Sequence, residues 1–188
     1  LEWTARALAL PGAGAHPAER LDTMSGRARA LWAVGAREEE LALIADAVSA
    51  ARALGDPVRL ARTLEAQANQ LTGYSADADA LAAAALEAAR ATGDEWAIGM
   101  AARAWAMTAP GLADIRERVD MAAALLERAG NRYHLASLLA SAAYGALGQD
   151  ADADADAYIR RSVPIASQLD NPHLWMLRRD TPWKAVQI

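Results

Sequence analysis

The sequence predicts an all-α solenoid, an α-α superhelix of about four helical hairpins with partial repeats at both ends. A corner phrase, Ala-Arg-Ala-Leu-Gly-Asp at residues 51–56, returns as Ala-Arg-Ala-Thr-Gly-Asp at residues 89–94 and more loosely around residues 130 and 170. This spacing of 37 to 40 residues is typical of stacked helical repeats. Alanine supplies 51 of the 188 residues, which favours helices because alanine loses no side-chain entropy in them.

We expect one helical-repeat domain over residues 1–188. Because both ends of the chain fall within the repeat pattern, we also expect it to be a piece of a longer protein. The first partial repeat is predicted to be a helix that stops at a Pro-Gly-Ala-Gly breaker. The predicted repeats span about residues 17–55, 56–93, 94–130 and 131–170, with partial repeats at 1–10 and 171–188.

The first full repeat shows the signals that place its helices. Pro17 suits the first turn of a helix, where its missing N–H costs nothing, so a helix should run from there to about residue 34. Three glutamates at residues 38–40 favour the positive end of the next helix. That helix should end at Gly55, since glycine tolerates the left-handed turn.

The remaining repeats follow the same alternation. Asp56 is predicted to cap the next helix and Pro57 to open it. Pro164 removes a backbone hydrogen bond from the last long helix, so we expect a kink or an end there. Further helices are predicted at about residues 58–71, 81–92, 94–107, 113–129, 131–147, 150–169 and 173–177, with a corner at residues 73–75.

Alignment of the repeats on their corners gives columns of similar residues. A column that is small in every repeat indicates that two helix backbones approach too closely there for a larger side chain. The first helices have such a column in Ala28, Ala68, Ala106 and Ala143, and an apolar one in Met24, Leu64, Ala102 and Leu139. The second helices have three apolar columns: Ile44, Ala82, Val119, Ile159; Val48, Leu86, Ala123, Val163; and Ala51, Ala89, Leu126, Ala166.

The corner phrase followed by an apolar helix resembles the tetratricopeptide-like repeats of large bacterial regulators. The resemblance is to actinobacterial, ATP-dependent LuxR-type transcriptional regulators and to multidomain proteins with nucleotide-cyclase domains, and it covers about residues 17–177. It implies a tetratricopeptide-like solenoid that acts as a sensor or scaffold arm beside an ATPase and an output module. The units are longer than the usual ~34 residues, and the Trp-Leu-Gly-Tyr pattern is missing, so a more divergent helical-hairpin repeat stays open.

Composition and charge exclude several functions. The formal net charge of −5, with Lys184 as the single lysine, argues against a nucleic-acid partner, which needs clustered basic residues. The absence of cysteine excludes disulfides, thiolate metal sites and cysteine nucleophiles. No stretch has 18 uninterrupted apolar residues and no basic-then-apolar leader is visible, so we expect a cytoplasmic protein without a membrane partner.

No motif points to catalysis, a cofactor or a metal. Nucleophile elbow, Walker loop and dinucleotide-binding glycine patterns are all missing from the sequence. Alternating acids at residues 150–156 resemble the start of a calcium loop, but Ala155 and Arg161 stand where that loop needs Gly and Glu. We interpret this run, and likewise Asp77 and Asp79, as acids at the start of a helix.

Histidine and tryptophan have mainly structural interpretations. The histidines lack the i, i+4 partner that a zinc site on one helix would need, so surface or capping roles are expected for His16, His134 and His173. Large aromatic residues in an alanine-rich solenoid fill gaps between hairpins more often than they anchor a peptide. We interpret Trp32, Trp96, Trp105 and Trp175 in this way, with groove anchors as the alternative.

Polar residues of the first helices form the best candidate site. Arg59, Arg62 and Glu65 are three residues apart and Asn69 follows four later, so they share one helix face. In tetratricopeptide-like stacks the first helices line the concave surface, so this face would line a groove for an acidic or extended peptide. A solvated face laced with Arg–Glu pairs is an equally good interpretation. The candidate ligand-binding residues are Arg59, Arg62, Glu65, Asn69, Arg103, Met107, Ser137, Ser141 and Tyr144.

Two functions follow from these observations. The first is a non-catalytic module of a larger regulator that binds a protein, a peptide or a neighbouring domain of its own parent chain. The second is an arm that senses a small-molecule inducer and controls a neighbouring ATPase domain. No residue pattern supports an enzyme. Because stacked repeats need polar units at their ends, we also expect end-to-end self-association.

Overall fold

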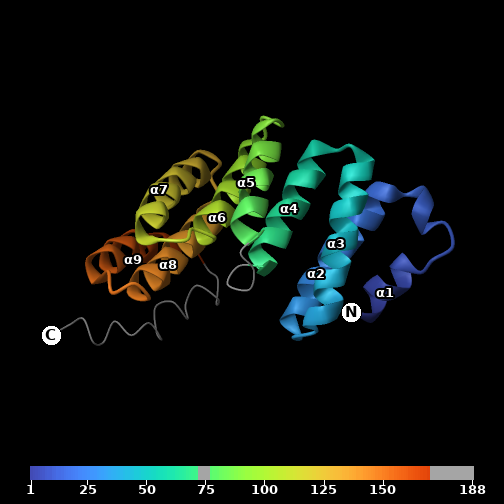
Figure 1. Cartoon of the computed structure of the whole chain (residues 1–188), viewed down its shortest axis with the longest axis horizontal. Coiled ribbons are helices and arrows are strands. Elements are labelled where there is room, and N and C mark those ends of the chain that lie inside the picture. The colour runs from blue at the N-terminus through green and yellow to red at the C-terminus, as the bar shows by residue number, and fades with distance from the viewer. Residues whose placement is uncertain (72–76, 170–188) are drawn as a thin grey trace.

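The computed structural model describes residues 1–71 and 77–169, and every regular element in these residues is helical. A short helix, α1 (Glu2–Leu8), and a 3-10 helix, η1 (Ala13–Ala15), come first. Four hairpins follow one another along the long axis of the molecule (Figure 1). The prediction of an all-α fold is confirmed. The hairpins are α2 (Pro17–Ala33) with α3 (Arg37–Leu54), α4 (Pro57–Leu71) with α5 (Asp77–Arg90), α6 (Glu95–Met107) with α7 (Leu112–Arg128), and α8 (Arg132–Leu147) with α9 (Asp152–Ala166).

The helix ends lie at the predicted capping residues. Gly55 ends α3 with φ +70°, the left-handed conformation that favours glycine. The Asp56 carboxylate then accepts hydrogen bonds from the backbone N–H groups of Val58 and Arg59, at 3.0 and 3.1 Å. Asp94 caps α6 in the same way. The Gly-Asp corner is therefore a C-cap joined directly to an N-cap, which explains why it returns at the repeat boundaries.

The C-terminal part of the array differs in two details from the predicted pattern. Helix α9 ends at Ala166, two residues beyond Pro164, so the proline lies in the last turn. Val163 was predicted to be apolar core but is 38% exposed, because α9 packs mainly against α8 and no helix of the described residues covers its outer side. The predicted corner at 73–75, the helix at 173–177 and the partial repeat at 171–188 lie outside the described residues.

Alanine dominates the contacts between helices. All members of the predicted small column, Ala28, Ala68, Ala106 and Ala143, are at most 3% exposed. Direct contacts join α4 to α6 and α6 to α8, the first helices of successive hairpins. A Cβ added at Gly99 of α6 would lie 3.1 Å from the Leu126 side chain of α7. The alanine column is therefore buried, and the contact of α6 with α7 at Gly99 has little room for a larger residue.

Five ion pairs join residues that are 37 to 41 positions apart, which is about one repeat. Each pair connects equivalent helices of neighbouring hairpins, either two first helices or two second helices. The hairpins are thus joined by arginine–carboxylate bridges as well as by alanine packing. The pairs are Arg59–Asp22, Arg103–Glu65, Arg118–Asp79, Arg116–Asp154 and Arg161–Asp120.

The most buried arginine of these bridges is Arg118, which is 9% exposed. Its guanidinium pairs with Asp79 of α5, donates a hydrogen bond to the backbone carbonyl of Trp105 at 3.2 Å, and lies 4.1 Å from the centre of the Trp105 ring. Asp79 also accepts a hydrogen bond from Thr108 at 3.1 Å. Arg118 therefore ties α5, α6 and α7 together, and Trp105 fills a gap between hairpins as predicted.

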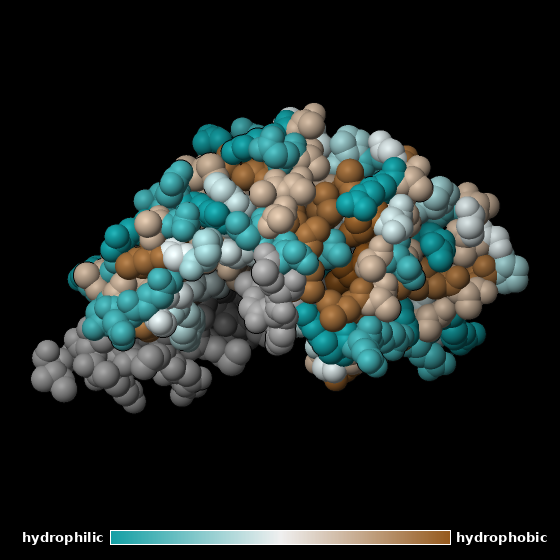
Figure 2. Space-filling model, viewed as in Figure 1, coloured by the Kyte–Doolittle hydropathy of each residue, from teal (hydrophilic) through white to brown (hydrophobic). Residues whose placement is uncertain are grey.

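The surface is mixed in character. In the view of Figure 2, apolar residues gather in a hollow over α3 and α4, and hydrophilic residues cover the flanks. Among the described residues, no helix is both long enough and apolar enough to cross a bilayer.

We expect Ala143→Leu to lower the free energy of unfolding by about 1 to 3 kcal/mol, because the larger side chain overpacks a contact that is 1% exposed. Urea denaturation measures this effect. The control is Ala84→Leu at an exposed position of α5, where a change of at most about 0.5 kcal/mol is expected. Equal effects of the two substitutions would contradict the close-approach interpretation.

The Arg118 bridge yields a second prediction. Arg118→Ala should lower the free energy of unfolding by about 1 to 3 kcal/mol, because it removes three hydrogen bonds, two to Asp79 and one to the Trp105 carbonyl. Its matched control is Arg116→Ala, two residues earlier on α7. The side chain of Arg116 is 54% exposed in its pair with Asp154, so a smaller loss is expected there. A similar loss in both variants, measured by urea denaturation, would show that burial of Arg118 adds nothing.

Candidate functional site

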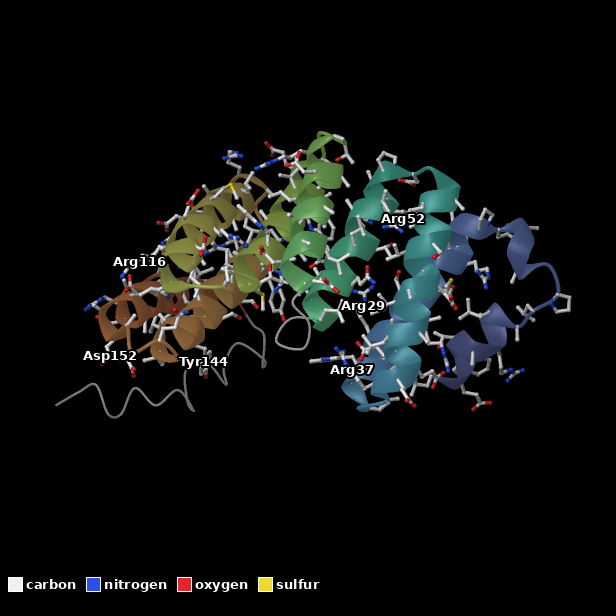
Figure 3. All side chains as sticks on the ribbon, viewed as in Figure 1. Arg29, Arg37, Arg52, Arg116, Tyr144 and Asp152 are labelled. Atoms are coloured by element: carbon white, nitrogen blue, oxygen red, sulfur yellow. The ribbon has the colours of Figure 1, made fainter. Side chains whose placement is uncertain are left out.

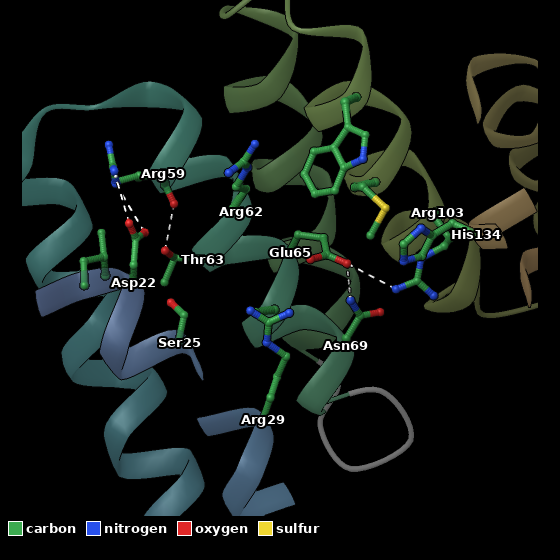
Figure 4. A pocket seen from close by; sticks show the side chains of 14 residues that line it. Asp22, Ser25, Arg29, Arg59, Arg62, Thr63, Glu65, Asn69, Arg103 and His134 are labelled. Atoms are coloured by element: carbon green, nitrogen blue, oxygen red, sulfur yellow. Dashed lines mark hydrogen bonds and ion pairs between the residues drawn. The ribbon is translucent and has the colours of Figure 1, made fainter. Parts of the chain in front are cut away.

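A pocket of about 510 Å³ opens on the first-helix face, which we define as the side of the array formed by α2, α4, α6 and α8. Figure 4 shows the 14 side chains that line it. All of them come from the first helices of the hairpins, and each of the four hairpins contributes at least one. The pocket is therefore a product of the stacking and not of any single repeat.

The structure brings five of the nine predicted site residues together in this pocket: Arg59, Arg62, Glu65, Asn69 and Arg103. Met107 lies behind them, where its sulfur accepts a hydrogen bond from Arg103 at 3.0 Å. Ser137, Ser141 and Tyr144 do not line the pocket. Tyr144 is 47% exposed and lies on α8 away from Arg29 (Figure 3).

The pocket crosses the repeat columns obliquely. Alignment on the alanine column places Arg29, Asn69, Met107 and Tyr144 at equivalent positions of the four first helices. The first two line the pocket and the last two do not. Helix α6 contributes residues from its first three turns, and α8 contributes only from its first turn. Ser137, Ser141 and Tyr144, which were predicted on a similar face of the fourth first helix, therefore lie outside this pocket.

Several pocket residues were not among the candidates. Asp22, Ser25 and Arg29 of α2 line the pocket, although the sequence analysis considered no polar face on this helix. The column alignment contains the missing signal, since Ser25 and Arg29 are equivalent to Glu65 and Asn69.

Two aromatic residues of the pocket also differ from their expected roles. Trp96 was interpreted as a core residue but is 40% exposed and lines the pocket. Trp32 is 64% exposed, so it is not a core residue either. His134 lies at the start of α8 as expected, but it is half-buried in the pocket wall and not on the open surface. Trp175 and His173 lie outside the described residues.

Arg59 is held by two carboxylates. Its Nε and Nη2 atoms face the two Asp22 oxygens at 3.3 and 3.1 Å, and its Nη1 atom lies 2.7 Å from Asp56 Oδ2. The hydrogen bonds from the Arg59 backbone and side chain lower the pKa of Asp56 below its ordinary value. This bridge links α4 to α2 at one end of the pocket (Figure 4).

Glu65 forms the buried centre of the pocket, with a side chain that is 14% exposed. It accepts a hydrogen bond from Arg103 Nη2 at 3.2 Å and another from the Asn69 amide. Burial nevertheless raises the pKa of Glu65, because desolvation outweighs the stabilisation by Arg103 and Asn69. Asn69 Oδ1 and Arg103 Nε are buried without a hydrogen-bond partner in the described part of the chain. One acceptor and one donor are therefore available for further hydrogen bonds near Glu65.

Arg62 and Arg29 are both exposed. The Arg62 guanidinium lies 4.6 Å from the centre of the Trp96 ring, a cation–π contact worth about 0.5 to 1 kcal/mol at an exposed site. Among the described residues, no carboxylate forms an ion pair with Arg62 or Arg29. Their charges therefore face the opening of the pocket.

His134 is neutral at physiological pH. Burial, with a smaller contribution from the Arg103 charge, lowers its pKa from 6.5 to about 4. Its Nδ1 atom lies 2.8 Å from the Oδ1 acceptor of Asn131, so Nδ1 carries the proton and Nε2 is the acceptor. The ring also packs edge-on against Tyr133, with centroids 4.9 Å apart.

The charge of the pocket is opposite to that of the chain. Its lining includes four arginines but one aspartate and one glutamate, whereas the whole chain has a formal charge of −5. The pocket has two hydroxyl residues, Ser25 and Thr63. Thr63 donates to the Arg59 carbonyl at 2.7 Å and the histidine pairs with Asn131, so Thr63 and His134 do not form a nucleophile–base pair. Among the described residues, no three His, Asp or Glu side chains are grouped to hold a metal ion. The arrangement is suited to binding an anionic group.

No model of a protein family matches the chain, and no curated protein matches its sequence. The pocket therefore has to be interpreted from its own chemistry.

Protonation of His134 should make the fold less stable in acid. Its folded pKa of about 4 lies below the ordinary 6.5, so its contribution is complete above pH 6.5 and is lost as the pH falls toward 4. We expect His134→Gln to lose about 1 to 3 kcal/mol less than the wild type over this interval, measured by urea denaturation at each pH. Glu65 acts with the opposite sign, because its raised pKa favours the protonated form, but it is common to both proteins.

The control for this measurement is His16→Gln, at an exposed position before α2. This variant should lose as much stability as the wild type between the two pH values. If His134→Gln and the wild type lose the same stability, His134 is not held neutral by the pocket.

Proposed function

We propose that the chain is a non-catalytic helical-repeat module that binds a protein or peptide partner. The observation that carries this proposal is the pocket, because its lining comes from the first helices of four different hairpins. A surface that runs across several repeats suits an extended segment of a partner. Arg29 and Arg62, which pair with no carboxylate of the described residues, favour an acidic segment, because a guanidinium presents a fork of N–H donors that matches a carboxylate.

We further propose that this module belongs to a larger bacterial signalling or transcriptional regulator in the cytoplasm. The support is the resemblance of the Gly-Asp corner phrase to the tetratricopeptide-like repeats of LuxR-type regulators. In such a parent protein, the partner is either a separate protein or a neighbouring domain of the same chain. End-to-end association of the modules is a related proposal, which the exposed Trp3 and Leu10 of the N-terminal end support.

A small-molecule inducer that controls a neighbouring ATPase domain is the second candidate. The pocket volume of about 510 Å³ favours it, since sites for small molecules commonly measure ~300–1,000 Å³. The exposed ring of Trp96 and the half-buried ring of His134 would then contact a planar ligand.

Selection of random short peptides displayed on phage against the whole chain tests the first candidate. We expect the selected peptides to bind, and Arg62→Glu to weaken their binding about tenfold, the equivalent of 1.4 kcal/mol, because it replaces a cation at the pocket opening. The matched control is Arg52→Glu on α3, an exposed arginine that lies apart from Arg29 (Figure 3). Isothermal titration calorimetry with a synthetic copy of a selected peptide measures both variants.

Two results would contradict this proposal. Peptides that bind both variants equally would place the binding site elsewhere on the chain. A failure to select any peptide, together with a raised melting temperature in the presence of a metabolite, would favour the small-molecule candidate.

A further inference from the structure

The pocket holds two arginines that no carboxylate of the described residues neutralises. Of its four arginines, Arg59 and Arg103 are already paired with carboxylates. Arg29 and Arg62 form no ion pair with any carboxylate of the described residues, and both are exposed. The positive charge available to a ligand is therefore located at these two side chains.

These two arginines lie on opposite sides of Glu65, as Figure 4 shows. Arg62 precedes Glu65 by three residues on α4, so the two share a helix face. Arg29 reaches the same place from α2, and its charge is close enough to act on the pKa of Glu65. A single carboxylate with 14% of its side chain exposed thus lies between two unpaired guanidinium groups.

Arg62 is also held in position. Its stacking over Trp96, with 4.6 Å from the guanidinium carbon to the ring centroid, restricts a side chain that would otherwise sample many rotamers. A pre-positioned arginine loses less conformational entropy when it binds an anion. The contact also leaves the N–H edge of the guanidinium available for hydrogen bonds, because a stacked cation uses its face.

We propose that the pocket binds an extended peptide segment carrying two acidic side chains, one paired with Arg29 and the other with Arg62, and that Glu65 weakens this binding by competing for the same two cations. This inference rests on the proposed peptide-binding function. Acidic residues two positions apart in an extended chain lie on the same side, ~6.6 Å apart along the strand. Such a pair therefore presents two carboxylates to one side of the peptide.

A free dicarboxylate presents the same acidic groups, but a peptide accounts for more of the pocket. Beyond the arginines, the lining continues through Trp96 and Met100 of α6 to His134 of α8. These side chains offer apolar and ring surface that a free diacid leaves uncovered. The peptide is therefore the source that we assign, and the experiment includes a diacid to test it.

The probe is the acetylated and amidated peptide Gly-Ser-Glu-Ala-Glu-Ser-Gly, titrated into the whole chain by isothermal titration calorimetry at low salt. Its controls are the same peptide with both glutamates replaced by glutamine, and free glutarate. We expect the glutamate peptide to bind at least about tenfold more tightly than either control. The glutamine peptide cannot form the two charge-assisted pairs, and glutarate forms them without the further contacts of a peptide.

Variants of the chain test the roles of the individual residues. Arg29→Glu and Arg62→Glu should each weaken binding of the glutamate peptide about tenfold, and Arg52→Glu should leave it unchanged. Glu65→Gln should tighten binding about threefold to tenfold, because it removes a competing charge. A purely structural role of Glu65 would not produce this gain.

If Glu65→Gln does not fold, as judged by circular dichroism, a charge-reversal variant provides a second test. The double variant Arg29→Glu with Arg62→Glu should prefer the same peptide with lysine in place of both glutamates. Absence of this exchange would overturn the assignment of the two arginines.

Other results would also overturn the proposal. These are equal binding of the glutamate and glutamine peptides, no binding of any probe, glutarate binding as tight as the peptide, or a Glu65→Gln variant with unchanged or weaker binding. Phage-selected peptides whose binding requires Arg62, but which contain no pair of acidic residues, would contradict the assignment of two acidic side chains and would still support the proposed peptide-binding function. If no selected peptide binds, both fail.

Discussion

Where successive hairpins meet, the helix backbones face each other through alanine, as at Ala68, Ala106 and Ala143, each at most 3% exposed. A contact of this kind brings helices close but buries little apolar surface per residue. The chain adds arginine–carboxylate bridges between equivalent helices, about one repeat apart in sequence. The arginines of these bridges range from exposed to buried, and Arg118 is 9% exposed. The pocket is the place on the first-helix face where several of them converge.

Local signals account for most of the fold. The Gly55 C-cap and the Asp56 N-cap are decided by backbone conformation and by hydrogen bonds within four residues, so the corner phrase was sufficient to place them. Val163 shows where the pattern failed. Its column is buried in the earlier repeats, but burial depends on what covers a helix, and the described residues place nothing over that side of α9. Sequence periodicity predicts which residues share a helix face, but it does not predict whether another helix packs against that face.

The candidate site was predicted in part for the same reason. Arg59, Arg62, Glu65 and Asn69 share a face of one helix, which spacing alone reveals, and all four line the pocket. The position of Tyr144 depends on how far each hairpin is displaced from the previous one, and this displacement has no local signal in the sequence. The exposure of Trp96 has a similar origin, since composition indicates an aromatic residue but not whether a neighbouring helix covers it. The sequence therefore did not predict how successive hairpins are placed relative to one another, and the rest of the site depends on that placement.

Contacts among the described helices join each hairpin to the next one along the array, so stability should add up from neighbour to neighbour as in a linear chain. In such a chain the end units fray first and the middle unfolds last. The pocket has a different connectivity, since its lining runs from α2 to α8. An occupant that contacts both α2 and α8 joins the first hairpin to the fourth and adds a connection that the helices themselves lack. Occupancy would therefore act chiefly on cooperativity, so that the four hairpins unfold as one unit.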